Sequence, residues 1–463
     1  PTRRLATELG VARATVVEAY ARLVAEGFVT AHAGSATRVA VGAGSEPTPA
    51  EASETPVARF DLRPGGPDVG LFPHEAWARI VARVVRHAPE ALAYGDPVGA
   101  PPLRTALAAY LGRTRAVTTT PDGIIVTGGV TQGLTLLCRA LARRGDRTLA
   151  VEDPGPNPLE RESIRRAGLE PLPIPVDDAG IDVAALERSG ASAVLVTPAH
   201  QYPTGSVLSA ERRRALVRWA RSDRRLVIED DYDAEFRYDR LAVAALQGLA
   251  PRRVAYLGSA SKLLAPGLRL GWLVPPDWLR VAVAEEKQYD DYGSPSLDQL
   301  ALAALIDEGT LGRHVRRARL AYRHRRDATL AAIARHLPGW QARGVAAGLQ
   351  VLVQPPIDLR GPIDERAIVL RAFRAGIWIT GLASFHHPVA EDVPHRRPGL
   401  VIGYAMVAEQ DIDAGIAALA AIVRDVEREG VSPTPDTNER RPRGRRSSVA
   451  SERRPIAPIR NPG

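Results

Sequence analysis

Cysteine, methionine and lysine are scarce in this chain of 463 residues, and long apolar runs are missing. The single cysteine, Cys138, excludes an intramolecular disulfide and is typical of a reducing compartment, so we expect a cytoplasmic protein. No apolar run reaches the length of a membrane span, and the N-terminus has no signal-peptide pattern. The sequence does not begin with methionine, so we expect residues to precede Pro1.

Lysine is far rarer than arginine. The chain contains 61 lysines and arginines, and only two of them, Lys262 and Lys287, are lysines. Arginine keeps its charge in a protein, whereas a desolvated lysine can lose its proton and act as an amine nucleophile. Lys262 lies in the stretch GSASKLLAPGLRLGW. Two interpretations are open, a surface residue in an arginine-rich chain or a lysine whose amine is needed, and the neighbouring motifs must decide between them.

The formal net charge of +8 is unevenly distributed. Residues 431–463 contain eight arginines and three acidic residues, a net charge of +5, which leaves +3 for the other 430 residues. This segment is rich in proline, arginine and serine, so we expect a disordered basic tail. Residues 42–58 combine proline, serine, alanine and glutamate without periodicity, which is typical of a flexible linker.

Residues 1–41 have the pattern of a small DNA-binding module. Helical spacing of apolar residues predicts one helix over 5–10 and a second over 12–26, and a hairpin follows around Gly34 and Ser35. This order is that of a winged helix-turn-helix whose supporting first helix would precede Pro1, and a plain helical hairpin is the alternative. The second helix of such a module enters the major groove by its N-terminal end. The candidate DNA contacts are Arg3, Arg4, Arg13, Thr15 and His32.

From residue 59 onward, apolar runs that resemble strands alternate with amphipathic helices. The runs end in glycine, aspartate or serine, which favours an α/β fold with a parallel sheet buried on both faces. We expect a large domain over 59–310 and a smaller C-terminal subdomain over 311–430. In a parallel sheet the ligand binds beyond the carboxyl ends of the strands. Those ends carry Gly129, Asp153, Asp230, Asp231 and Ser259.

Three groups at these strand ends fit one cofactor. Val130 and Thr131 begin a helix after Gly129 and can donate backbone N–H groups to a phosphate. Asp230 supplies a carboxylate, and Lys262 supplies an amine. A phosphate anchor, a carboxylate and a Schiff-base lysine are what pyridoxal 5′-phosphate (PLP) requires.

The sequence also resembles a known family over roughly residues 1–428. Its front resembles the GntR-type winged helix in LATELGVARATVVEAYARLVAEGFV. Its body resembles a fold-type I aminotransferase in YGDPVGAPPLR, TPAHQYPTG, IEDDYDAEFRY and GSASKLLAPGLRLGW. Together these motifs are similar to the MocR/GabR-like transcriptional regulators. The resemblance implies a homodimeric, PLP-dependent regulator of double-stranded DNA, with a mainly parallel central sheet and a smaller C-terminal α+β subdomain.

The resemblance also implies roles for individual residues. Lys262 would bond to PLP, Asp230 would pair with the pyridine nitrogen, and Tyr232 would lie near the phenolic oxygen. Tyr94 would reach the phosphate bound by the second subunit. The phosphate would be held by the backbone of Val130 and Thr131 and by Ser259, Ser261 and Arg269.

Three positions depart from the family pattern. Pro156 stands where a tyrosine usually stacks on the cofactor, and Pro158 where some members carry a ligand-binding arginine. Val401 stands where an arginine usually clamps the substrate carboxylate. Arg396 and Arg397 lie just upstream and are alternative candidates for that clamp. The loss of a buried arginine–carboxylate pair weakens binding by roughly 2–5 kcal/mol.

Three functions remain open from the sequence. The first is a regulator in which a small amine or amino acid reacts at Lys262 and changes DNA binding. The second is a working aminotransferase with a vestigial front domain, which the missing arginine disfavours. The third is a regulator that uses PLP only structurally. His386, His387 and His395 are interpreted as loop histidines, because no ligand spacing supports a metal site.

Overall fold

The computed structural model describes residues 2–32, 36–40, 58–222, 225–238, 243–357, 363–388 and 396–431. The chain divides into two units, Pro1–Pro56 and Val57–Gly463. The predicted linker and basic tail lie outside the described residues except for residues 58 and 431, as do Gly34, Ser35 and His395. Within the described part of the chain, no helix is long and apolar enough to cross a membrane.

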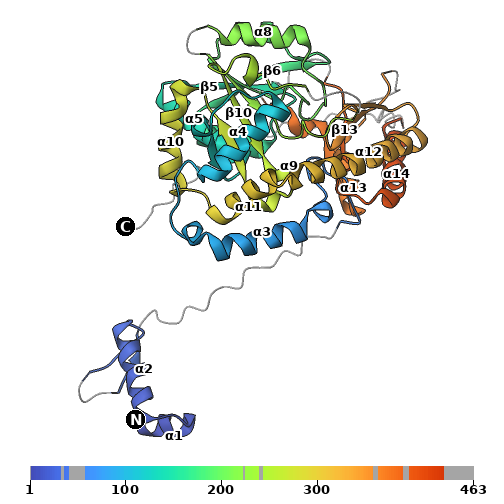
Figure 1. Ribbon diagram of the computed structural model, residues 1–463. Helices are drawn as coiled ribbons and strands as arrows, with labels where there is room; N and C mark the ends of the chain where they lie inside the picture. The colour runs from blue at the N-terminus through green and yellow to red at the C-terminus, as the bar shows by residue number, and fades with distance from the viewer. Residues whose placement is uncertain are drawn as a thin grey trace, which may run out of the picture. The chain divides into compact units, whose positions relative to one another are not determined.

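The N-terminal unit has the predicted order of two helices and a hairpin (Figure 1). Helix α1 (Thr2–Leu9) and helix α2 (Arg13–Ala25) are joined at Gly10, whose φ of 64° suits glycine. Strands β1 (Val29–Thr30) and β2 (Arg38–Val39) pair in antiparallel orientation. Helices α1 and α2 contact each other, and each buries one apolar side chain, Ala6 in α1 and Val16 in α2. This order of elements is the one predicted for the winged helix-turn-helix.

The larger unit contains an eight-stranded sheet in the order β4-β11-β10-β9-β8-β5-β6-β7. The five strands β10, β9, β8, β5 and β6 run parallel to one another, whereas β11 is antiparallel to β4 and β10, and β7 is antiparallel to β6. The mainly parallel sheet is therefore confirmed. Its strands are β4 (Ile125–Thr127), β5 (Thr148–Asp153), β6 (Glu170–Asp177), β7 (Gly180–Ile181), β8 (Ala193–Val196), β9 (Leu226–Asp230), β10 (Val254–Ser259) and β11 (Gly271–Val274).

Helices cover both faces of this sheet, so neighbouring residues of one strand enter different cores (Figure 1). Ile125 packs in the core beside α5 and α10, whereas Val126 packs in the core beside α4 and α11. Because both faces are buried, apolar residues follow one another along each strand and do not alternate with polar residues. The helices of this region are α3 (His74–His87), α4 (Pro101–Arg115), α5 (Val130–Arg143), α6 (Pro158–Arg166), α7 (Val183–Arg188), α8 (Ala210–Ala220), α9 (Ala260–Leu263), α10 (Asp277–Asp291) and α11 (Ser296–Asp307).

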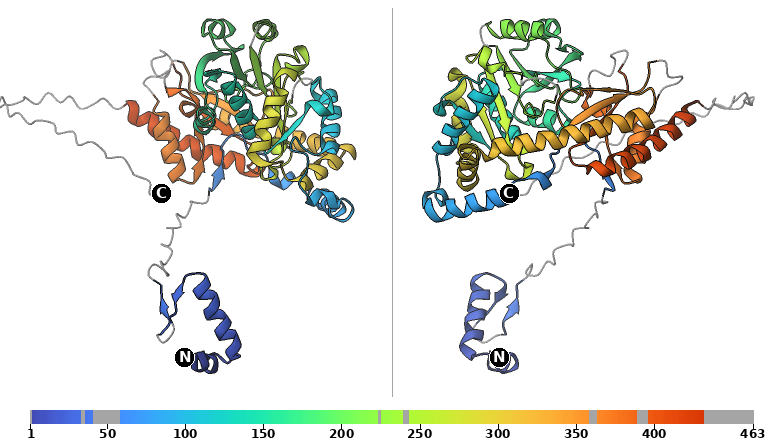
Figure 2. Two further views of the ribbon diagram at one scale, coloured as in Figure 1. Left: turned by 90° about the vertical axis from the view of Figure 1, so that its left-hand side faces the viewer. Right: turned by 45° about the vertical axis from the view of Figure 1, so that its right-hand side comes forward.

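The C-terminal segment forms a four-stranded antiparallel sheet in the order β12-β13-β16-β15. One face of this sheet is covered by three helices, and Figure 2 shows α12 and α14 beside one another. The elements are α12 (Thr310–His336), β12 (Gln341–Arg343), β13 (Gln350–Gln354), α13 (Glu365–Arg374), β15 (Thr380–Gly381), β16 (Leu400–Gly403) and α14 (Glu409–Val431).

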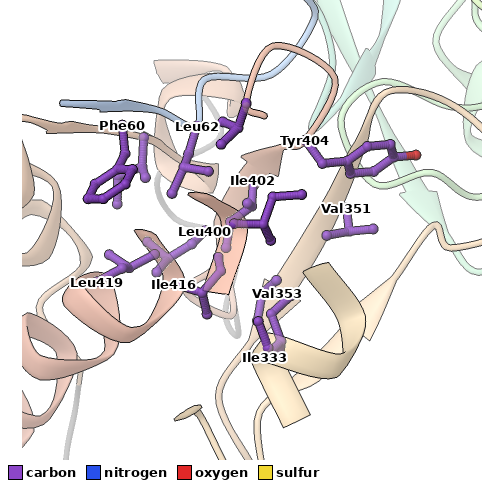
Figure 3. Close-up of a cluster of buried hydrophobic side chains, with 14 of the residues drawn as sticks. Phe60, Leu62, Ile333, Val351, Val353, Leu400, Ile402, Tyr404, Ile416 and Leu419 are labelled. Atoms are coloured by element: carbon purple, nitrogen blue, oxygen red, sulfur yellow. The ribbon is translucent and has the colours of Figure 1, made fainter. Parts of the chain in front are cut away.

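An early segment of the larger unit belongs to this C-terminal core. Strand β3 (Phe60–Asp61) pairs in parallel with β14 (Ile377–Trp378). Phe60 and Leu62 lie among side chains of β13, β16, α12 and α14 (Figure 3). Residues 60–62 therefore share a core with the segment 311–430, and the subdomain limit at residue 310 stays a prediction.

Candidate functional site

A cavity of about 370 Å³ lies at the carboxyl ends of β5, β8, β9 and β10, a size that suits a small ligand. The first residues of α5 and residues of α6 complete its wall. Eight residues with predicted roles at the cofactor line this one cavity: Lys262, Asp230, Tyr232, Ser259, Ser261, Arg269, Val130 and Thr131. The topology brings most of them together because parallel strands place their carboxyl ends at one edge of the sheet. Arg269 lies at the same edge because it precedes β11, which runs antiparallel to β10.

Lys262 lies in the short helix α9, which directly follows β10. Its Nζ donates a hydrogen bond to the carbonyl oxygen of Gly65. Burial lowers the pKa of Lys262, and the charges of Asp233, Asp230 and Glu160 partly oppose this shift. A lowered pKa increases the fraction of unprotonated amine, which is the reactive form.

Asp230 ends β9, and its carboxylate lines the cavity. Its Oδ1 is buried and has no hydrogen-bond partner among the described residues. Burial raises the pKa of Asp230 well above its ordinary value, and neighbouring carboxylates raise it further. A ligand that offers a protonated nitrogen would satisfy this oxygen and stabilise the charged form. The pyridine nitrogen of PLP is such a group, so the site fits this cofactor.

The phosphate end of the cofactor also has a matching wall. Helix α5 begins at Val130, so the backbone N–H groups of its first turn have no partner within the helix. Gly129 precedes it with a φ of 105°, and a Cβ atom there would lie 3.2 Å from Nη2 of Arg269. Arg269 is thus held against the start of α5, where a guanidinium and free N–H groups can bind a phosphate together. Ser259 and Ser261 line the same cavity.

A buried hydrogen-bond network holds Tyr232, and the residues of that network were not singled out in the sequence. The phenol oxygen of Tyr232 lies 2.9 Å from Nδ1 of His200 and accepts a hydrogen bond of 3.1 Å from Nε2 of Gln350. His200 Nδ1 also lies 2.8 Å from Oδ2 of Asp233. His200 and Tyr202 belong to the motif TPAHQYPTG, which directly follows β8. This position at a strand end was the signal by which the sequence could have identified them. Gln350 comes from β13 and had no such signal.

The remaining predicted site residues lie outside the cavity. Tyr94 is 96% exposed and does not line it. The five candidate DNA contacts lie in the N-terminal unit and are all exposed: Arg3, Arg4, Arg13, Thr15 and His32. Arg13 and Thr15 occupy the first turn of α2. Nε of Arg4 donates a hydrogen bond of 2.8 Å to Glu8, so part of its charge is already paired.

The two prolines that depart from the family pattern flank the start of α6. Pro156 lines the cavity, and Pro158 is the first residue of the helix. Asn157 caps the helix, since its Oδ1 accepts from the backbone N–H of Leu159 and Glu160. Oε2 of Glu160 accepts in return from the backbone N–H of Asn157 at 2.9 Å. This capping box fixes the carboxylate of Glu160 at the cavity wall.

No alternative arginine replaces the missing clamp in the described part of the cavity wall, which contains Arg269 alone. Val401 is fully buried in an apolar cluster with Leu352, Leu382 and Phe385. Nη2 of Arg396 donates to Oδ2 of Asp153 at 3.2 Å and to the carbonyl of His387 at 3.1 Å. Nη2 of Arg397 donates to the carbonyl of Pro355 at 2.6 Å. Both arginines line a neighbouring cavity of about 640 Å³ and do not enter the first.

The histidines of this region do not form a metal site with other described residues, since no group of three potential ligands occurs among them. His386 instead places Nδ1 3.2 Å from Oδ1 of Asp153.

Glu152 gives the cofactor-free protein a predicted pH dependence. Burial raises the pKa of Glu152 from 4.5 to about 7, and hydrogen bonds from Thr197 oppose the shift. Because the folded pKa exceeds the unfolded one, this group's contribution is fully present below pH 4.5 and is lost as pH rises through 7. Glu152→Gln should therefore lose less stability between about pH 5 and pH 8 than the wild type does, with a difference of up to about 3 kcal/mol.

Urea unfolding of the cofactor-free protein at the two pH values measures this difference. Glu187→Gln, which changes an exposed residue of α7, is the matched control and should follow the wild type. Equal losses of stability in wild type and Glu152→Gln would contradict the assignment.

Comparison with known proteins identifies both units. Residues 1–39 match the model of the gntR family of bacterial regulatory proteins, and residues 67–388 match that of aminotransferase class I and II. The probable rhizopine catabolism regulatory protein MocR of Rhizobium meliloti is 31% identical over 96% of this chain and 92% of its own length. The pyridoxine biosynthesis transcriptional regulator PdxR of Corynebacterium glutamicum is 32% identical over 91% of this chain and 90% of its own length.

The fold of the larger unit has close counterparts among solved structures. The multiple substrate aminotransferase of Thermococcus profundus superimposes with a TM-score of 0.72 and 27% identity, over 81% of this chain and 93% of that protein. The fold-type I expectation is therefore confirmed. The chain belongs to the MocR-type family of transcriptional regulators, in which a gntR-type helix-turn-helix domain precedes an aminotransferase-like domain, and it is a DNA-binding regulator whose cofactor is PLP.

Proposed function

We propose that the cavity around Lys262 holds PLP and receives a small amine or amino acid, and that this ligand changes how the protein binds DNA. One observation carries the proposal: the amine of Lys262 and a buried, unpaired oxygen of Asp230 line the same cavity. When bound, PLP supplies an aldehyde that forms an imine with a primary amine. A ligand amine therefore competes with the lysine for the same carbon atom.

The chain's own residues would divide the work of holding the cofactor. Lys262 would supply the amine, Asp230 would accept the proton of the pyridine N–H, and Tyr232 would lie beside the phenolic oxygen. The phosphate would accept hydrogen bonds from the backbone of Val130 and Thr131, from Ser259 and Ser261, and from Arg269. We also propose a cytoplasmic homodimer in which the exposed Tyr94 of each subunit reaches the phosphate bound by the other.

The N-terminal unit would contact DNA through the exposed first turn of α2. Arg13 and Thr15 would enter the major groove, as in other helix-turn-helix modules. Arg3, Arg4 and His32 would contact the backbone phosphates, which position the protein without specifying a sequence.

A working aminotransferase is a weaker candidate. Such an enzyme holds the substrate carboxylate in a fixed geometry, usually with a bidentate arginine. Among the described residues of the cavity wall, Arg269 is the one arginine, and it lies at the proposed phosphate site. The apolar Val401 occupies the position of the missing clamp.

The proposal is tested by following one titration with two measurements. The PLP-loaded protein is titrated with amines and amino acids while its visible absorption spectrum and its affinity for DNA are recorded. The DNA is a duplex that the protein itself has selected from random sequences. We expect one class of ligand to shift the absorption band and to change the DNA affinity over the same concentration range, since linked equilibria must move together.

Arg13→Ala is the control for this experiment. It should weaken DNA binding with and without the ligand and leave the absorption band and its response unchanged, because Arg13 lies in the other unit. A band that no amine or amino acid shifts, in a protein that still binds DNA, would contradict sensing and favour a structural use of PLP.

A further inference from the structure

We propose that the ligand of this regulator is an amine that carries a second positive charge and no carboxylate, such as a linear diamine, and that Glu160 binds the second ammonium. This inference rests on the proposed function, because it names the class of ligand that enters the same cavity. It follows from the charges that line the cavity, from the position of Glu160 and from the groups that the wall lacks.

Acidic side chains outnumber basic ones at the described cavity wall. Three carboxylates line it, those of Glu152, Glu160 and Asp230, against the two cations Lys262 and Arg269. In the proposed function PLP would engage Lys262, Arg269 and one of the carboxylates, Asp230. Glu152 is already engaged, because its Oε2 accepts hydrogen bonds from the backbone N–H and the hydroxyl of Thr197. Glu160 is the carboxylate that remains for a ligand.

Glu160 is held in place but is not neutralised. Its Oε2 accepts from the backbone N–H of Asn157, and no ion pair of Glu160 occurs among the described residues. Burial raises the pKa of Glu160, while the charges of Lys262 and Arg161 lower it. An ammonium beside this carboxylate would offset the cost of burying its charge.

The position of Glu160 suits a ligand that begins at Lys262. The two side chains line one cavity, so a ligand amine that takes the place of the Lys262 amine shares its space with the carboxylate of Glu160. Tyr202 lies between apolar and polar regions of this wall, since it lines the cavity and also packs against the cluster of Val401 and Phe385. The ring of Tyr202 therefore offers the methylene groups an apolar neighbour.

A carboxylate at the far end of the ligand would find no arginine to pair with among the described residues of this wall beyond Arg269, which lies at the proposed phosphate site. Arg161 lies next to Glu160 in α6, but its guanidinium donates to the backbone carbonyls of Pro156, Ser384 and Phe385 and does not line the cavity. Arg396 is paired with Asp153 outside the cavity. The charge of Glu160 would in addition repel a carboxylate, so the wall selects against amino acids.

Three ligands with the same four-carbon chain separate the alternatives. Butane-1,4-diamine has an ammonium at its far end, butylamine has a methyl group, and 4-aminobutanoate has a carboxylate. We expect the diamine to shift the absorption band of the PLP-loaded protein at a concentration about tenfold lower than butylamine does. A charge-assisted hydrogen bond to the second ammonium strengthens binding by about that factor. This exceeds the factor of two that follows from having two amino groups. We expect 4-aminobutanoate to be the weakest of the three.

Two variants of helix α6 test the role of Glu160. Glu160→Gln removes the charge, yet glutamine can still accept the hydrogen bond of the capping box. It should reduce the preference for the diamine over butylamine from about tenfold to about twofold. Glu162→Gln changes a neighbour that pairs with Arg166 outside the cavity, so it should keep the preference of the wild type. The rise in melting temperature on adding each ligand is the second readout and should follow the same order.

The outcomes separate this inference from the function on which it rests. If 4-aminobutanoate or butylamine acts at as low a concentration as the diamine, or if Glu160→Gln keeps the preference, the diamine class is wrong while amine sensing stands. If none of the three ligands moves the band or the melting temperature of a protein that carries PLP, amine sensing and this inference fail together.

Discussion

Replacing Lys262 with alanine is expected to abolish the absorption band that PLP gives with the wild-type protein. Lys262 is the single lysine among the described residues of the cavity wall, and only a primary amine can form the imine. The second lysine, Lys287, is buried in α10, where Nζ donates to both carboxylate oxygens of Asp291. It cannot take over the role without breaking that ion pair.

Lys262→Arg is the matched control for the loss of charge. Arginine keeps a positive charge beside Asp230 and Glu160 but cannot form an imine, so we expect this variant to lack the band as well. Reduction with borohydride followed by peptide mass spectrometry should locate the modified lysine at position 262 in the wild type. A band that persists in Lys262→Ala, or a label on Lys287, would show that another amine holds the cofactor.

Replacing Arg115 with alanine is expected to lower the free energy of unfolding of the larger unit by about 3–5 kcal/mol, the usual effect of breaking a buried ion pair. Nε of Arg115 donates to Oδ2 of Asp231 at 2.6 Å, and Nη2 donates to Oδ1 at 3.0 Å. The side chains of both residues are 1% exposed. The hydroxyl of Tyr256 also donates to Asp231. Removing the guanidinium leaves a buried carboxylate without its counter-charge.

Urea unfolding of the PLP-free protein at neutral pH measures this effect. Arg113→Ala changes an exposed arginine of the same helix, α4, and should alter the stability by less than about 0.5 kcal/mol. Replacing both partners with apolar residues, Arg115→Met with Asp231→Leu, should recover most of the loss, because no unpaired charge remains. A loss below about 1 kcal/mol in Arg115→Ala would contradict the burial of the pair.

This pair also bears on the candidate site, since Asp231 is the residue after Asp230. Asp231 accepts from Arg115 of α4 and from Tyr256 of β10, and its backbone N–H donates to the carbonyl of Leu257. The end of β9 is thereby tied to two other elements. The stable position of Asp230 at the cavity therefore depends on an ion pair that does not touch the ligand.

The sequence by itself was sufficient to place Lys262, Asp230, Val130 and Arg269 in one site. Lys262, Asp230 and Val130 lie at or just after the carboxyl ends of strands, which parallel strands bring to one edge of a sheet. Arg269 reaches the same edge because it precedes β11, which runs antiparallel to β10. The order of elements in the N-terminal unit followed from local signals as well, because helical spacing and Gly10 act over a few residues. Local periodicity and strand direction are sufficient for these predictions.

Only the tertiary structure decided which other groups share that cavity. Glu160 faces the ligand space because a capping box turns its side chain back along α6, whereas Glu162 in the same helix pairs with Arg166. The neighbours of Val401 in β16, Leu400 and Ile402, lie in the C-terminal core. Val401 therefore points to the opposite face of the sheet, where it packs in a cluster with Leu352. Contacts between distant segments determine these orientations, so no local pattern in the chain contains them.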